Sequence, residues 1–266
     1  MSGLYYPAAQ NAILTLILHF WYEWGCPGGP KILNQTRFDY LTPSPIIDCD
    51  HPRILAHARA VAGPNGGNDP VAAAVRLYYD VRDGIWYDPY LPFYKAEHYR
   101  ASRVLESRRA FCIGKAGLLC ALGRAVGIPS RVGFSDVRNH FTTRQFREFL
   151  GSDVFVFHGY TEFFLEGKWV KATPAFNAEL CRRHRVNPLE FNGQEDSIFQ
   201  PYNQDHQLFM EYLTDRGRYA DIPVERIVAA MEETYGEQRV WKWIDAYEKN
   251  GGASLRSFEL EEVVGK

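Results

Sequence analysis

Hydrophobic positions along this chain repeat with the spacing of helices near both ends and with the spacing of strands in between. Helical spacing predicts helices over 52–62 and 70–83, and the second has Asp69 as a capping residue with proline directly after it. Two further helices are predicted near 223–235 and 237–249. A glycine- and asparagine-rich turn separates the helices predicted over 52–62 and 70–83.

Residues 112–126 have no wide polar face, because only Lys115 and Arg124 are charged among small and aliphatic residues. Such a pattern predicts a helix that is buried on most sides. Gly127 and Pro129 follow it and predict where it ends.

The period changes to two after this segment, which predicts strands over 130–134, 154–165 and 168–173. Glu166 and Gly167 between the last two predict a two-residue hairpin turn. The order of helices, strands and helices predicts an α+β fold with an antiparallel sheet.

The chain divides by composition into three parts. A breaker cluster, CPGGP, ends an apolar stretch at 12–24, so we expect residues 1–30 to be an N-terminal appendage. We expect 31–200 to form the core and 201–266 to be a C-terminal helical extension packed on it. The apolar stretch is too short and too interrupted for a comfortable membrane span.

Composition excludes several classes of function. A net charge of −2 gives no general attraction to nucleic acid or to an anionic membrane, so we expect neither as a partner. The five cysteines are an odd number without a CxxC pair, which argues against a disulfide framework or a zinc site and favours a reducing, cytoplasmic location. No cofactor-binding motif is present, and we expect no cofactor or metal.

Cys112 opens the predicted buried helix. A thiol in the first turn of a helix feels the positive end of the helix dipole, which favours the nucleophilic thiolate. A free cysteine is also a common buried residue with no chemical role. Cys112 alone therefore supports a catalytic and a structural interpretation.

The predicted hairpin supplies partners for this thiol. If Leu165 faces Lys168 across the turn, Thr173 lies opposite Tyr160, and His158 becomes its diagonal neighbour on one face of the sheet. Glu162 falls on that face too. A cysteine at a helix start, a histidine on a following strand and a polar residue on the next strand match the order of nucleophile, base and orienting residue.

Two segments resemble one family. The run CIGKAGLLCALGRAVGIPSRV at 112–132 resembles the cysteine helix of the transglutaminase-like superfamily, and HGYTEFFLEGKWVKATP at 158–174 resembles its histidine strand, hairpin and third-residue strand. This resemblance covers roughly 68–177. It implies a papain-like fold in which the cysteine helix packs on an antiparallel sheet.

The resemblance also implies a reaction. Cys112 would attack a carbonyl of a peptide or protein substrate and form a thioester, while His158 takes and returns the proton. The N–H of Cys112 would donate to the oxyanion. Water as the acceptor gives hydrolysis and an amine gives transamidation; the family's many small members favour hydrolysis.

The third catalytic position departs from the family. Thr173 stands where the family has aspartate, and it can accept a hydrogen bond but supplies no charge. Asn177 is an alternative third residue and Glu162 a weaker one, while Phe111 replaces a glycine often found before the cysteine. A non-catalytic transglutaminase-like module that binds or scaffolds is therefore the alternative function.

Overall fold

The computed structural model describes residues 40–63, 68–140, 142–258 and 261. Phe38–Lys266 form one compact unit. The predicted appendage, 1–30, lies outside the described residues. The elements are α3 (Pro52–Ala62), α4 (Pro70–Gly84), β1 (Trp86–Tyr87), η1 (Ala96–His98), α5 (Ala101–Ser107), β2 (Arg109–Ala110), α6 (Cys112–Ala125), β3 (Ser130–Asn139), α7 (Arg144–Leu150), β4 (Val154–Leu165), β5 (Lys168–Ala172), α8 (Ala178–His184), β6 (Met210–Tyr219), α9 (Val224–Tyr235) and α10 (Glu237–Lys249).

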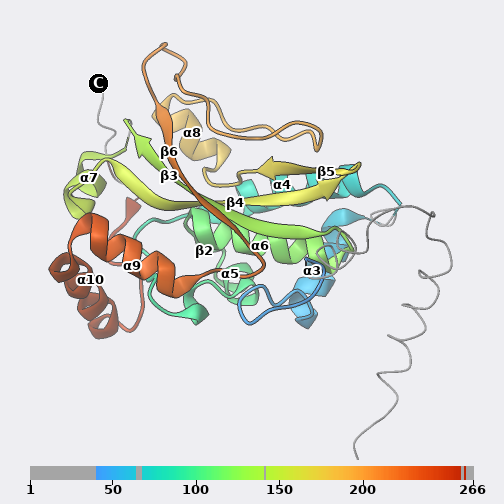
Figure 1. Ribbon diagram of the computed structural model, residues 1–266, viewed down its shortest axis with the longest axis horizontal. Helices are drawn as coiled ribbons and strands as arrows, with labels where there is room; N and C mark the ends of the chain where they lie inside the picture. Colours follow the sequence, from blue (N-terminus) through green and yellow to red (C-terminus); the bar gives the residue numbers. More distant parts are fainter. Residues whose placement is uncertain (1–39, 64–67, 141, 259–260, 262–266) are drawn as a thin grey trace, which may run out of the picture. The chain divides into compact units, whose positions relative to one another are not determined.

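An antiparallel sheet with the order β5-β4-β3-β6 organises this unit. Helix α6 packs on one face of the sheet, mainly against β4, and α9 reaches the same strand (Figure 1). The predicted α+β, papain-like arrangement of a cysteine helix on an antiparallel sheet is confirmed.

The hairpin between β4 and β5 has the predicted register. Leu165 pairs with Lys168, and Glu166 and Gly167 form the turn with φ angles of 47° and 88°. Positive φ at both positions is typical of the turn whose twist matches that of the strands. The last pair joins Thr161 to Ala172. Strand β5 therefore ends just before Thr173, and the described strands leave the first half of β4 unpaired on that side.

The sheet extends further than the sequence predicts. Strand β3 continues to Asn139, where we expected it to end at Phe134, and β6 pairs with its other edge. Strand β6 lies within 201–266, the range expected to be a helical extension, where it precedes α9 and α10. The middle of β6 is exposed, and its mixture of Thr214, Asp215 and arginines lacks the alternation by which a strand is recognised.

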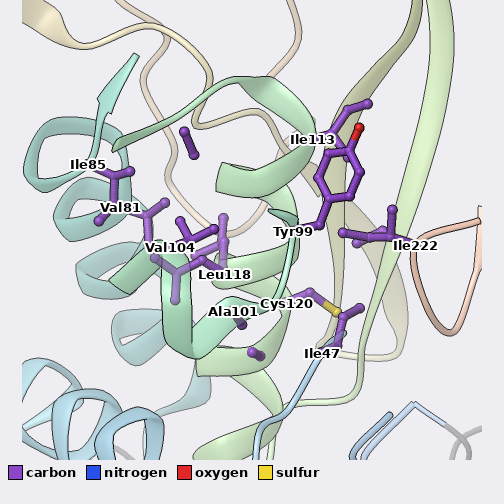
Figure 2. Close-up of a cluster of buried hydrophobic side chains, with 14 of the residues drawn as sticks. Ile47, Val81, Ile85, Tyr99, Ala101, Val104, Ile113, Leu118, Cys120 and Ile222 are labelled. Carbon is purple, nitrogen blue, oxygen red and sulfur yellow. The ribbon is translucent and has the colours of Figure 1, made fainter. Parts of the chain in front are cut away.

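Helix α6 is buried along almost its whole length, as predicted. Its side chains meet those of α4, α5 and two connecting segments. Figure 2 shows Ile113, Leu118 and Cys120 of this helix among side chains that include Val81 and Ile47. The helix therefore forms the centre of the hydrophobic core, which explains why it has no polar face.

Arg124 is one of two charged residues, with Lys115, that are buried on this helix. It is 4% exposed, and its guanidinium donates to the carbonyl oxygens of Ser130 at 2.9 Å, Thr42 at 2.8 Å and Ala220 at 2.7 Å. A guanidinium can satisfy several carbonyls at once because it carries five N–H donors. Arg124 thus ties α6 to the start of β3, to the segment before α3 and to the segment after β6.

Within the part of the chain that the structure describes, no helix has both the length and the apolar character needed to cross a bilayer.

The contact between α6 and the sheet leads to a stability prediction. A Cβ added at Gly123 would lie 2.5 Å from Cε1 of Phe163 and 2.5 Å from Oγ of Ser130, both in the core. We expect Gly123→Ala to lower the free energy of unfolding by about 1–3 kcal/mol through overpacking. Urea denaturation measures this change.

Gly117→Ala on the same helix is the matched control. Its Cβ would meet the tip of Ile222, Cδ1 at 2.8 Å, which can rotate away. Helix propensity favours alanine over glycine by about 1 kcal/mol, so this variant should be as stable as the parent or more stable. Equal losses in both variants would contradict the proposed packing.

Candidate active site

Cys112 is the first residue of α6 and is only partly buried, whereas Cys49, Cys120 and Cys181 are buried. The short parallel pair β1–β2 fixes the chain directly before it, where Tyr87 pairs with Ala110. The N–H of Cys112 belongs to the first turn of α6, where backbone N–H groups have no partner within the helix.

Gly159 brings β4 into backbone contact with the start of α6. A Cβ at this position would lie 2.9 Å from Cα of Ile113 and 3.3 Å from the carbonyl oxygen of Cys112. Only glycine permits this approach. The contact occurs where β4 has no β5 neighbour, so the helix start adjoins an open strand edge.

His158 precedes Gly159 and is therefore held next to Cys112. Both residues line one cavity of about 70 Å³, and His158 is 5% exposed. The other side of the imidazole meets Phe199, with the ring centroids 5.1 Å apart. The structure thus brings together the predicted nucleophile and the predicted base.

A β-bulge directly before His158 fixes the backbone of β4. Ser135 pairs with His158 but Val137 pairs with Phe155, so two residues of β4 oppose Asp136 alone. Phe157 in the bulge has a φ of 54°, which costs a non-glycine residue roughly 1–2 kcal/mol.

The carboxylate of Asp136 stabilises this bulge. It accepts a hydrogen bond from the N–H of Phe157 at 3.0 Å and is paired with Arg216 of β6 at 2.7 Å. The guanidinium of Arg216 also lies over the Phe157 ring, 5.4 Å from its centroid. The ion pair therefore holds the strained residue that sets the direction of His158.

Burial raises the pKa of the Cys112 thiol to about 11. The N–H groups of Gly159, Ile113 and Cys112 itself act in the opposite direction, because they point at the sulfur and favour the thiolate. Desolvation is the larger effect, so the thiol is protonated at neutral pH.

Burial also lowers the pKa of His158 to about 4, and the imidazole is neutral at pH 7. Its Nε2 is buried without a hydrogen-bond partner among the described residues, and so is Oγ1 of Thr173. In the described structure, the predicted base and the predicted third residue thus each have a buried side-chain atom that lacks a hydrogen-bond partner.

The backbone of Thr173 is firmly held although its hydroxyl is not. The hydroxyl of Tyr78 donates toward the carbonyl oxygens of Thr173 at 3.1 Å and Leu189 at 2.9 Å. Thr173 itself is 2% exposed. A residue at this position therefore has a defined place in the core next to β5.

Asn177 is not free to support His158. Its Oδ1 accepts from the N–H of Tyr87 at 2.9 Å, and its Nδ2 donates to the carbonyl oxygens of Arg82 at 2.6 Å and Ile85 at 2.8 Å. The ammonium of Lys115 binds the same two carbonyls at 2.8 and 2.7 Å. Asn177 and Lys115 thus satisfy the C-terminal end of α4.

Glu162, the weaker candidate, is also engaged elsewhere. Its carboxylate pairs with Arg131 at 2.6 Å and with Arg218 at 3.3 Å. Of the three candidates for the third position, only Thr173 has a side chain without a hydrogen-bond partner in the described structure.

Three residues of this site were not singled out from the sequence. Gly159 could have been recognised, because a glycine inside a strand indicates a close backbone approach. Asp136 and Arg216 lie on different strands, and no local pattern links them. The segment from Trp86 to Tyr90 both packs in the core and lines the site: Tyr90 is fully buried, and Tyr87 and Pro89 line the cavity of Cys112.

In the described ranges, no group of three or more His, Cys, Asp or Glu side chains is arranged to hold a metal ion.

Comparisons with known proteins concern the segment that carries these residues. The family model of the transglutaminase-like superfamily matches residues 58–174, which include Cys112, His158 and Thr173. No curated protein matches the chain.

Solved structures show weaker similarity. The crystal structure of a "putative cysteine protease" from Cytophaga hutchinsonii is 15% identical, with a TM-score of 0.40 over 68% of this chain and 46% of that chain. The periplasmic domain of TgpA from Pseudomonas aeruginosa is 20% identical, with a TM-score of 0.35 over 53% of this chain and 47% of that chain. This chain spans about half the length of these structures.

The match covers the cysteine helix, the histidine strand and the hairpin in their predicted order, and the fold around them has the expected architecture. Residues 58–174 of this chain are therefore similar to the transglutaminase-like superfamily in sequence and in the order of these elements.

Proposed function

We propose that this chain is a cysteine hydrolase or acyltransferase that acts on amide or peptide bonds through a thioester on Cys112. One observation carries the proposal. Cys112 at the start of α6 and His158 on β4 line the same cavity, and backbone contact at Gly159 keeps them together.

The reaction begins from an uncharged pair. His158, neutral at pH 7, accepts the proton of the Cys112 thiol as the sulfur attacks the substrate carbonyl. The N–H of Cys112 donates to the developing oxyanion. Collapse of the intermediate breaks the bond to the leaving amine, which takes the proton from His158. Water or a second amine then cleaves the thioester.

The step that forms imidazolium is the costly one in this site. His158 is buried, and Thr173 offers its Nε2 no carboxylate. A cation formed there has only dipoles to stabilise it, so acylation should be slower than in an enzyme with aspartate at this position. An uncharged substrate bound in the cavity does not supply the missing charge.

The same observation favours a second candidate. A domain that retains the fold but has lost the carboxylate would serve as a binding or scaffolding module. The buried, unpartnered atoms of His158 and Thr173 agree with such a loss of activity, and they agree equally well with slow catalysis. Acylation of Cys112 separates the two functions.

The first test measures acylation directly. The chain is incubated with a 4-nitrophenyl ester, and the acyl group is located by intact and peptide mass spectrometry. We expect one acyl group on Cys112, absent in Cys112→Ala. His158→Gln should slow acylation by about 10²–10⁴-fold, because it removes the base.

Cys181→Ala is the matched control, since it removes a buried thiol that does not line the cavity of Cys112. It should acylate at the parent rate. Acylation of His158→Gln at the parent rate, or adducts that persist in Cys112→Ala, would leave the non-catalytic module as the function.

The depressed pKa of His158 gives a second prediction. An unfolded histidine takes up a proton near pH 6.5, but the folded His158 does so only near pH 4. As the pH falls through this range the unfolded state binds the proton first, so the free energy of unfolding decreases, by about 3 kcal/mol in total. Urea titrations between pH 7 and 4 measure it.

His158→Gln should remove this part of the pH dependence. His140→Gln, at a half-buried histidine beside Glu211, changes another histidine of the sheet and keeps His158. Parallel pH dependences of the parent and His158→Gln would show that the imidazole is not buried as described.

Restoring a carboxylate at position 173 gives a third prediction. We expect Thr173→Asp to raise the pKa of His158, since a nearby negative charge favours imidazolium, and to accelerate acylation at pH 7 by about 10-fold or more. Nitrogen-15 NMR reports the imidazole pKa and mass spectrometry the acylation rate.

Thr173→Asn has a similar shape without the charge and should leave the imidazole pKa low. Thermal unfolding checks that both variants fold. A folded Thr173→Asp with an unchanged His158 pKa would mean that this side chain does not reach the imidazole.

A further inference from the structure

The cavity beside Cys112 is mostly apolar. Apart from Cys112 and His158, its lining residues are aromatic, aliphatic, proline or methionine, and the tyrosines and tryptophan among them carry the remaining side-chain polar atoms. Its volume of about 70 Å³ exceeds the roughly 10–15 Å³ that one water needs, but a water also needs two or more polar partners. An apolar cavity of this kind stays dry and takes up apolar groups.

The far wall of the cavity comes from outside the family segment. Met231 and Tyr235 of α9 and Trp243 of α10 line it, whereas the family match ends at residue 174. Cys112 and His158 therefore lie within the family segment, whereas the residues that make this wall apolar and aromatic lie in the C-terminal helices.

Aromatic packing makes this wall rigid. The indole of Trp243 stacks on Phe149 of α7, with ring centroids 4.6 Å apart and an interplanar angle of 16°. Its ring also lies near those of Tyr235, at 5.8 Å, and Phe93, at 6.3 Å. The hydroxyl of Tyr235 is engaged with the backbone of β4, donating to the carbonyl of Val154 at 3.0 Å and accepting from the N–H of Val156 at 3.1 Å. Tyr235 therefore presents its ring, and its hydroxyl is committed elsewhere.

We propose that this cavity receives the acyl side of the substrate, so that Cys112 is acylated preferentially by apolar groups and discriminates against charged ones. The inference rests on the proposed function. In the acylation step the C–S bond forms, the bond from the carbonyl carbon to the leaving group breaks, and the thiol proton passes through His158 to the leaving group. Water then cleaves the thioester and releases the free acid.

The physical reason for selectivity is desolvation. An apolar acyl group exchanges water for aromatic walls, while a carboxylate would enter a site whose lining includes no lysine or arginine to pair with it. Hydrophobic pockets distinguish ligands that differ by one methylene by about 10–200-fold, so differences of at least this size are expected between a methyl and an aryl group.

The test compares 4-nitrophenyl esters of acetic, isovaleric, phenylacetic and succinic acid with the full chain. Second-order acylation rates of Cys112 should rise at least 10-fold from acetyl to isovaleryl or phenylacetyl. The hemisuccinate should react more slowly than the acetate. Rates that are equal across the series, or fastest for succinyl, would overturn the pocket assignment while leaving the proposed reaction in place.

Two tryptophans on α10 provide matched variants. Trp243 lines the cavity, whereas Trp241 is 59% exposed. Trp243→Ala should shift the preference toward larger groups such as naphthylacetyl, and Trp241→Ala should keep the parent ratios. Trp243→Phe, which retains an aromatic wall, covers the case in which the alanine variant does not fold. Parent ratios in a folded Trp243→Ala would overturn the assignment.

A binding measurement separates the two proposals. Toluene is titrated into the Cys112→Ala chain, and the methyl resonance of Met231 is followed by NMR. We expect saturable shifts, reduced in Cys112→Ala combined with Met231→Glu. Absence of binding would overturn the cavity inference even if acetyl esters react. Saturable toluene binding without acylation by any ester would overturn the proposed reaction and, with it, the acyl role of the cavity.

Discussion

The arrangement of this site depends on one backbone contact, where Gly159 of β4 meets Cys112 and Ile113 of α6. No side chain fits between them, because even a methyl group would overlap Cα of Ile113. The contact does two things at once. It places the preceding residue, His158, at the same cavity as Cys112, and it directs the N–H of Gly159 toward the sulfur. The reactive pair is thus positioned by the packing of a helix on a strand and needs no hydrogen bond of its own.

The protonation states follow from the same burial. Close packing removes water from both groups, which keeps the thiol protonated and the imidazole neutral. Aspartate at the third position would oppose this for the imidazole, but this chain has Thr173. Burial therefore favours the neutral imidazole of His158, which can accept a proton. It disfavours the imidazolium that forms once the proton has been transferred.

The sequence predicted those features that depend on local pattern. Helix α6 and the hairpin register follow from periodicity and turn chemistry, and the order of residues pointed to Cys112 and His158, which line one cavity. The long-range features did not follow. Strand β6 has the composition of a solvated loop because one of its edges is free, and the bulge before His158 depends on an ion pair between strands that are distant in sequence. Asn177 could be assigned to α4 only once its amide partners were known.

The ion pair between Asp136 and Arg216 has a consequence for what counts as the smallest working unit. Arg216 belongs to β6, beyond the segment that matches the family, yet it supports the residue that aims the imidazole. Arg124 likewise reaches past that segment to the carbonyl of Ala220. A fragment cut at the family boundary would keep every residue named in the reaction and lose the scaffold that orients them. The residues of the proposed reaction therefore all lie within the family segment. The residues that hold them in place also come from the C-terminal third of the chain.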